Sequence, residues 1–169
     1  MKKRLTAFIL AAASFILCAC SRVSGPVDAP FAPGISWDLD SARLEAVWGK
    51  CDAPYTSIYN GLTYSYPCEY LGRDGTVKFM FSDKGRLASV AWTFLTDSEE
   101  ELNSVYTEVE NAEKEKNGAG NVSESSGAAG NVWYTKDKDI LLTSVGVNGS
   151  YGFQYSYISR DFSKRNLAK

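Results

Sequence analysis

Apolar and polar residues alternate with a period of two in three consecutive stretches of this chain. The alternating apolar residues are Leu62, Tyr64 and Tyr66, then Val77, Phe79 and Phe81, and finally Val90, Trp92 and Phe94. This period is typical of β-strands, because successive side chains of a strand point to opposite faces. Turn-forming residues at 72–75 and 83–86 separate the stretches. The sequence therefore predicts an antiparallel meander of three strands.

Two other segments have the period of a helix. In the first, Asp40 can cap the amino end, Leu44, Val47 and Trp48 share one face, and Gly49 ends the helix. The second begins with a capping box and runs to about residue 116. Its capping residues are Ser98 and Glu101, and its apolar stripe consists of Leu102, Val105, Tyr106, Val109 and Ala112.

Two more strands are predicted near the carboxyl end. One covers 132–147, with an interruption at 136–139, and the other follows a hairpin turn at Asn148-Gly149. The aromatic side of this last strand is predicted to be core beneath the second helix, and consists of Tyr151, Phe153, Tyr155 and Tyr157. The order α-β-β-β-α-β-β predicts an α+β domain, with an antiparallel sheet of about five strands and helices packed on one face.

The predicted domain covers residues 36–160 and has less regular flanks. Residues 20–35 contain three prolines, which favour an extended, flexible tether. Residues 117–131 are nearly all small or polar and are expected to form a flexible loop. Residues 161–169 form a polar, basic tail.

The amino end has the layout of a secretory signal. Lys2, Lys3 and Arg4 precede an apolar run that extends to Ala19 without any acidic residue. The run is shorter than the roughly 20 residues that a membrane-spanning helix needs. We therefore expect residues 1–19 to be a signal peptide that is removed by cleavage.

The end of this signal, Leu17-Cys18-Ala19-Cys20, resembles the lipobox of bacterial lipoproteins. The resemblance implies cleavage between Ala19 and Cys20, a diacylglyceryl thioether on Cys20 and acylation of the new amino end. It places the exported protein on the cell membrane or outer membrane, because such acyl chains anchor a protein stably. Cys18 fits less well as the lipidated residue, since Phe15 and Leu17 would then occupy the −3 and −1 positions. An unlipidated, secreted protein is the alternative.

Charge and composition exclude several function classes. Removal of three basic residues with the signal leaves 15 basic against 20 acidic residues, a net charge of −5 that makes a nucleic-acid partner unfavourable. The chain contains no histidine, which excludes Ser-His and Cys-His nucleophiles and His-ligated zinc. Carboxylate pairs could still serve a hydrolase, but the candidates lie mostly in turns. These candidates are Glu69, Asp74, Asp83 and Asp97. We therefore expect no enzyme, no metal site and no cofactor.

Two cysteines and three tyrosines are the remaining candidate site residues. Cys51 and Cys68 would lie in an oxidising compartment after export, where a disulfide between them would persist. Two unpaired buried thiols are the alternative. Tyr55, Tyr59 and Tyr70 lie in or near predicted loops, where exposed aromatic rings could bind a partner.

The helix ending in Gly49-Lys50 and the later segment Phe81-Ser82-Asp83-Lys84-Gly85-Arg86-Leu87 resemble small envelope lipoproteins of the SmpA/OmlA and β-lactamase-inhibitor-like class. In that class a short helix ending in Gly-Lys-Pro precedes a meander, whereas Cys51 follows Lys50 here. The resemblance implies a domain that binds a partner protein or scaffolds an envelope complex.

A shorter similarity is to membrane-bound inhibitors of C-type lysozyme. It covers Ser126-Gly127-Ala128 and Trp133-Tyr134-Thr135-Lys136, and departs from that pattern at Ala129 and Asp137.

Taken together, these sequence features lead us to expect a non-catalytic envelope module that binds a protein or cell-wall material. The alternative is an inhibitor or sensor of an exported enzyme.

Overall fold

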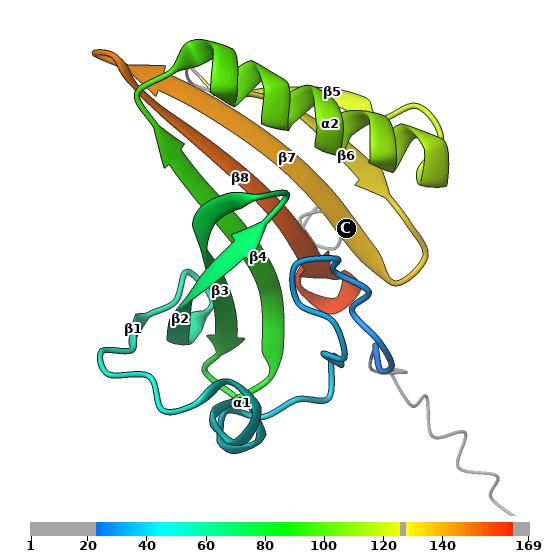
Figure 1. The fold of residues 1–169 in the computed structure, drawn as a ribbon. Helices are drawn as coiled ribbons and strands as arrows, with labels where there is room; N and C mark the ends of the chain where they lie inside the picture. The colour runs from blue at the N-terminus through cyan, green and yellow to red at the C-terminus, as the bar shows by residue number, and fades with distance from the viewer. Residues whose placement is uncertain (1–22, 126–127, 164–169) are drawn as a thin grey trace, which may run out of the picture.

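The structure is a computed structural model that describes residues 23–125 and 128–163. Eight strands form one antiparallel sheet in the order β1-β2-β3-β4-β8-β7-β6-β5 (Figure 1). The elements are, in chain order, α1 (Ser41–Trp48), β1 (Tyr55–Thr56), β2 (Asn60–Tyr70), β3 (Arg73–Ser82), β4 (Leu87–Thr96), α2 (Glu99–Asn117), β5 (Asn121–Ser125), β6 (Ala128–Tyr134), β7 (Lys138–Val147), β8 (Ser150–Ser159) and the 3-10 helix η1 (Arg160–Phe162).

The predicted fold class, a five-stranded sheet with helices on one face, is wrong. The described protein is mostly one large sheet of eight strands, with two α-helices. The predicted strand at 132–147 is two strands, since the chain turns back at 135–137 between β6 and β7. The predicted loop at 117–131 contains β5 and the start of β6, which pair with each other as a hairpin.

The other predicted elements are confirmed. The β2-β3-β4 meander and the β7-β8 hairpin form with antiparallel pairing. The side chain of Asp40 accepts a hydrogen bond from Arg43 N, and that of Ser98 accepts one from Glu101 N, so both predicted helix caps form. Two predicted apolar positions differ. Val47 of α1 is 72 % exposed, and Ala112 of α2 is exposed, so that Glu113 takes the predicted place of an apolar residue on the buried side of α2.

The apolar side of the sheet holds most of the core. Val77, Phe79, Val90, Trp92, Tyr155 and Tyr157 are all buried there and are neighbours across the strands. Helix α1 contacts this side through Trp48, whose ring centroid lies 5.1 Å from that of Phe79. Helix α2 contacts it through Tyr106, 6.0 Å from Phe153. The same side is also covered by the segment that precedes α1.

That preceding segment differs from the flexible tether expected at 20–35. Residues 20–22 lie outside the described residues, but Val27, Phe31 and Ile35 are each no more than 3 % exposed. Val27 N donates to Ile35 O at 2.9 Å, so the segment folds back on itself. The prolines mark its exposed positions, and the apolar residues between them pack on the sheet because this burial offsets the cost of ordering the backbone.

Candidate binding surface

The two ends of the described chain lie together. Val23 N donates to Asp161 Oδ2 at 3.3 Å, and the guanidinium of Arg86 contacts the same carboxylate at 2.5 Å. The predicted cleavage and lipidation residues, Ala19 and Cys20, lie outside the described residues. Since Val23 is only three residues after Cys20, the end of the domain formed by Val23, Arg86 and Asp161 is the end nearest the predicted lipid. We call it the anchor end.

Three long strands lead away from the anchor end. β4 starts beside Arg86, β7 starts at Lys138, whose Nζ donates to Val27 O at 2.6 Å, and β8 ends beside Asp161. Their other ends meet at the β7-β8 turn and at the start of α2, far from the anchor end in Figure 1. A strand of ten residues, such as β8, spans about 30 Å. This opposite end of the sheet is called the distal end.

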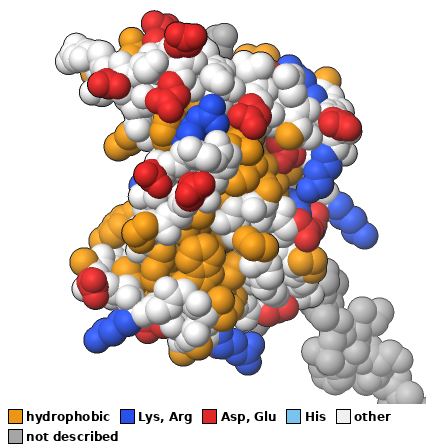
Figure 2. Space-filling model, viewed as in Figure 1, with side chains coloured by type: hydrophobic (Ala, Val, Ile, Leu, Met, Phe, Trp, Pro, Cys, Tyr) orange, Lys and Arg blue, Asp and Glu red, His pale blue; other side chains and the backbone are white. Residues whose placement is uncertain are grey.

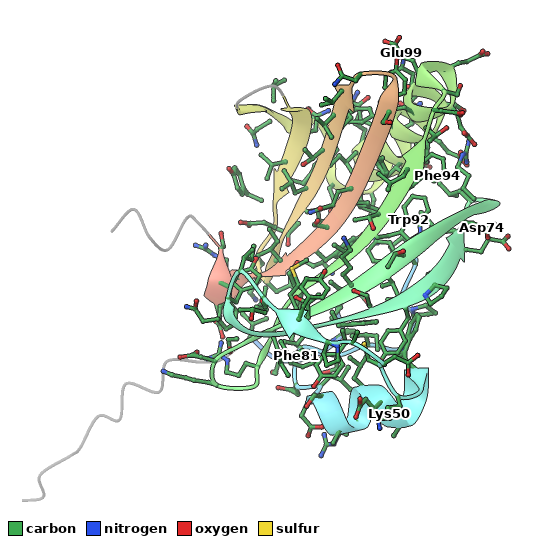
Figure 3. All side chains as sticks on the ribbon, turned by 90° about the vertical axis from the view of Figure 1, so that its left-hand side faces the viewer. Lys50, Asp74, Phe81, Trp92, Phe94 and Glu99 are labelled. Carbon is green, nitrogen blue, oxygen red and sulfur yellow. The ribbon has the colours of Figure 1, made fainter. Side chains whose placement is uncertain are left out.

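Acidic side chains concentrate at the distal end. Six exposed carboxylates lie on the β2-β3 hairpin, in the connection between β4 and α2 and on the first ten residues of α2, namely Glu69, Asp74, Asp97, Glu99, Glu100 and Glu108. Figure 2 shows red side chains gathered over α2 and this hairpin. In Figure 3, Asp74 and Glu99 lie on the outside, and Trp92 and Phe94 lie inward of them.

Among the described residues, Arg73 lies within this group of carboxylates and forms ion pairs with α2. Its guanidinium lies 3.4 Å from Glu108 Oε2 and 4.0 Å from Glu101 Oε1, and its side chain is 17 % exposed. Arg73 therefore joins the β2-β3 hairpin to α2. Because one guanidinium neutralises only one charge, the distal end keeps a strongly negative potential that attracts cationic groups.

An apolar patch lies at the same end, on the face of the sheet opposite α2. Leu95 is 80 % exposed, Val147 59 % and Val145 41 %. Leu95 and Val145 both pair with Gly152 of β8, and a Cβ at Gly152 would lie 3.4 Å from each of their side chains. The glycine therefore brings these two side chains close together. Leu95, Val145 and Val147 are called the outer patch.

The structure places the three predicted binding tyrosines in three different surroundings. Tyr55, on β1, is 49 % exposed. Tyr59 packs on Phe162 with centroids 5.6 Å apart, and burial raises its pKa. Tyr70 packs against Trp92, and burial raises its pKa to about 12. The three rings do not form one surface, and Tyr55 is the one that is widely accessible.

Cys51 and Cys68 are both free thiols in the structure. Cys51 Sγ donates to Ser65 O at 3.8 Å, whereas Cys68 Sγ donates to Phe31 O at 3.4 Å. Burial raises the pKa of Cys68, which lowers the thiolate fraction and hence its reactivity. The disulfide between the two cysteines stays a prediction.

Glu69 and Asp74, two of the four candidate carboxylates, lie directly opposite each other on β2 and β3, with both side chains exposed. Asp83 and Asp97 are exposed as well and lie in separate connections. Within residues 23–125 and 128–163, no group of three or more Cys, Asp or Glu side chains has an arrangement that could hold a metal ion. The helices in this part of the chain are too short or too polar to cross a bilayer.

Sequence reasoning missed a polar cluster in the interior. Glu113 of α2 is 3 % exposed, and its carboxylate accepts hydrogen bonds from the hydroxyls of Tyr155 and Tyr157. Burial raises the pKa of both tyrosines, so they remain hydrogen-bond donors. The signal was present in the sequence, because Glu113 lies four residues after Val109 and so on the same helix face. The cluster fastens α2 to β8.

Comparison with known proteins gives no family for this chain. The sequence matches no protein-family model, and no curated protein or solved structure is significantly similar to it.

Proposed function

We propose that this protein is an exported lipoprotein, anchored through Cys20, that binds a protein or cell-wall partner with its distal end and catalyses no reaction. The observation that carries the proposal is the position of Val23, three residues after the lipobox cysteine, at one end of the long strands. A lipid on Cys20 would hold that end beside the membrane. The distal end would then face away from it at a distance of about 30 Å.

Surface chemistry supports the choice of the distal end. Exposed aliphatic side chains, such as Leu95 and Val147, are worth roughly 1.5–3 kcal/mol each when a partner buries them fully. The carboxylates at the same end of the sheet, such as Asp97 and Glu100, would speed the encounter with a cationic partner and select against anionic ones. A partner of this surface therefore combines apolar and basic groups.

Two experiments test the proposal separately. Labelling cells with a radioactive fatty acid tests the anchor, because the label should enter the wild-type protein and not a Cys20→Ser variant. A photo-crosslinking residue at Val147 tests the distal end in living cells. It should give a discrete adduct, and the same residue at exposed Lys50, far from the distal end, should not.

The charge requirement gives a further control. Glu99→Lys with Glu100→Lys should weaken the adduct at Val147 without unfolding the protein, because both side chains are exposed. Capture of a soluble exported enzyme at Val147 would favour the inhibitor or sensor role instead. Equal labelling at Val147 and Lys50, or no adduct at either position, would contradict binding at the distal end.

A further inference from the structure

The anchor end contacts a turn that carries an exposed apolar residue. Asp83 N donates to Tyr59 O at 3.2 Å, so the turn between β1 and β2 lies against the turn between β3 and β4. The ring of Tyr59 packs on Phe162, which follows the Asp161 that holds Val23. In the turn between β1 and β2, Ile58 precedes Tyr59 and is 81 % exposed.

The length of chain before Val23 limits what can cover this end. Val23 is three residues after Cys20, and at full extension this stretch spans at most roughly 11 Å. If Cys20 carries lipid, the headgroups of the bilayer therefore lie within about one helix diameter of Val23. A large protein partner would not fit between the bilayer and this part of the domain.

We propose that the anchor end docks on the bilayer itself, with Ile58 inserted into the interfacial region. The exposed part of Tyr55 suits the same place, because tyrosine is enriched at the level of the headgroups. Exposed Lys84, in the neighbouring turn, suits anionic headgroups. This inference rests on the proposed lipid anchor and adds to it a fixed orientation of the domain, with the distal end turned away from the membrane.

The strength of docking can be bounded. Burying a side chain of the size of isoleucine favours the docked state by roughly tenfold to a hundredfold. The short connection to the lipid adds to this, because docking is then an intramolecular step with a high effective concentration. The docked state should therefore dominate in the lipidated protein.

Hydrogen exchange of the lipidated protein tests this inference. The protein is purified with its lipid, incorporated into nanodiscs of phosphatidylethanolamine and phosphatidylglycerol, and compared with the soluble mature chain carrying Cys20→Ser. The amides of the turns at 57–60 and 83–86 should exchange roughly tenfold more slowly, or more slowly still, in nanodiscs than in the soluble chain. Amides of the β7-β8 turn, at the distal end, should exchange equally in both samples.

Two matched variants identify the cause of the protection. Ile58→Asp should remove it, whereas Val147→Asp, which changes another exposed aliphatic residue, at the distal end, should leave it intact. Unprotected turns in a chain that mass spectrometry shows to be lipidated would overturn the docking alone. Protection that survives Ile58→Asp would also overturn it. A chain without acyl groups would overturn both the anchor and the docking.

Discussion

Replacement of Tyr155 by phenylalanine removes one hydroxyl from the interior and leaves the ring contacts in place. The hydroxyl donates to the carboxylate of Glu113, which is 3 % exposed. Phenylalanine keeps the packing on Phe31, whose ring centroid is 5.1 Å away. A buried acceptor that loses its donor and is not rehydrated costs about 1–3 kcal/mol. We expect Tyr155→Phe to lower the free energy of unfolding by about 2 kcal/mol.

Urea unfolding of the soluble mature chain, followed by circular dichroism, measures this loss. For a domain of this size, about 2 kcal/mol corresponds to a fall of roughly 4–8 °C in Tm. Tyr55→Phe is the matched control, because its hydroxyl is on a ring that is 49 % exposed and should change stability by less than about 0.5 kcal/mol. If both variants were equally stable, the tyrosine hydroxyl would not be sustaining a buried carboxylate, and the attachment of α2 to β8 would need another explanation.

Three further predictions concern the same fold. Gly75→Ala should cost about 1–3 kcal/mol, because the new Cβ would lie 2.5 Å from Trp92 Nε1, and an unchanged urea midpoint would refute this. Ser98→Ala should cost about 1 kcal/mol through loss of the cap on α2, whereas Ser150→Ala, at an exposed position, should cost much less. Burial raises the pKa of Tyr66 and of Tyr70 to about 12, whereas tyrosine in the unfolded chain ionises near pH 10. The free energy of unfolding should therefore be constant just below pH 10 and fall as the pH rises towards 12. Tyrosinate absorbance and circular dichroism should then change together. A constant free energy of unfolding between pH 10 and 12 would refute the raised pKa values.

Local signals in the sequence were sufficient for the meander and the helices. The alternation around Tyr64 and Phe79 places aromatic residues on one side of the sheet, and tight turns fix the pairing of neighbouring strands. Helix caps at Asp40 and Ser98 involve only residues within three positions of each other. Such short-range patterns do not depend on the rest of the fold, which is why they could be predicted.

The missed elements depend on contacts between distant residues. β5 and the first four residues of β6 are mostly serine, asparagine, alanine and glycine, which have little strand preference of their own, and β6 forms against β7. The segment around Phe31 resembles a linker in composition, yet its ring packs on Tyr155, more than a hundred residues away. Nothing local in either sequence indicates these neighbours.

The candidate surface was predictable only in part. Glu99 and Glu100 were visible as the acidic first turn of a helix. Their proximity to Asp74 required the pairing of β3 with β4 and the contact of Arg73 with α2. The outer patch required knowledge of which face of β4 stays uncovered, and this depends on where α2 packs.

The orientation proposed for both ends of the molecule depends on a lipid attached to Cys20. The mass of the mature protein tests this attachment most directly. The protein would be extracted from membranes of its host, and its amino-terminal peptide analysed by mass spectrometry. We predict a first residue Cys20 whose mass includes a diacylglyceryl group, and a Cys20→Ser precursor that retains residues 1–19. A mature chain that starts elsewhere, or that starts at Cys20 with a bare thiol, would contradict the anchor.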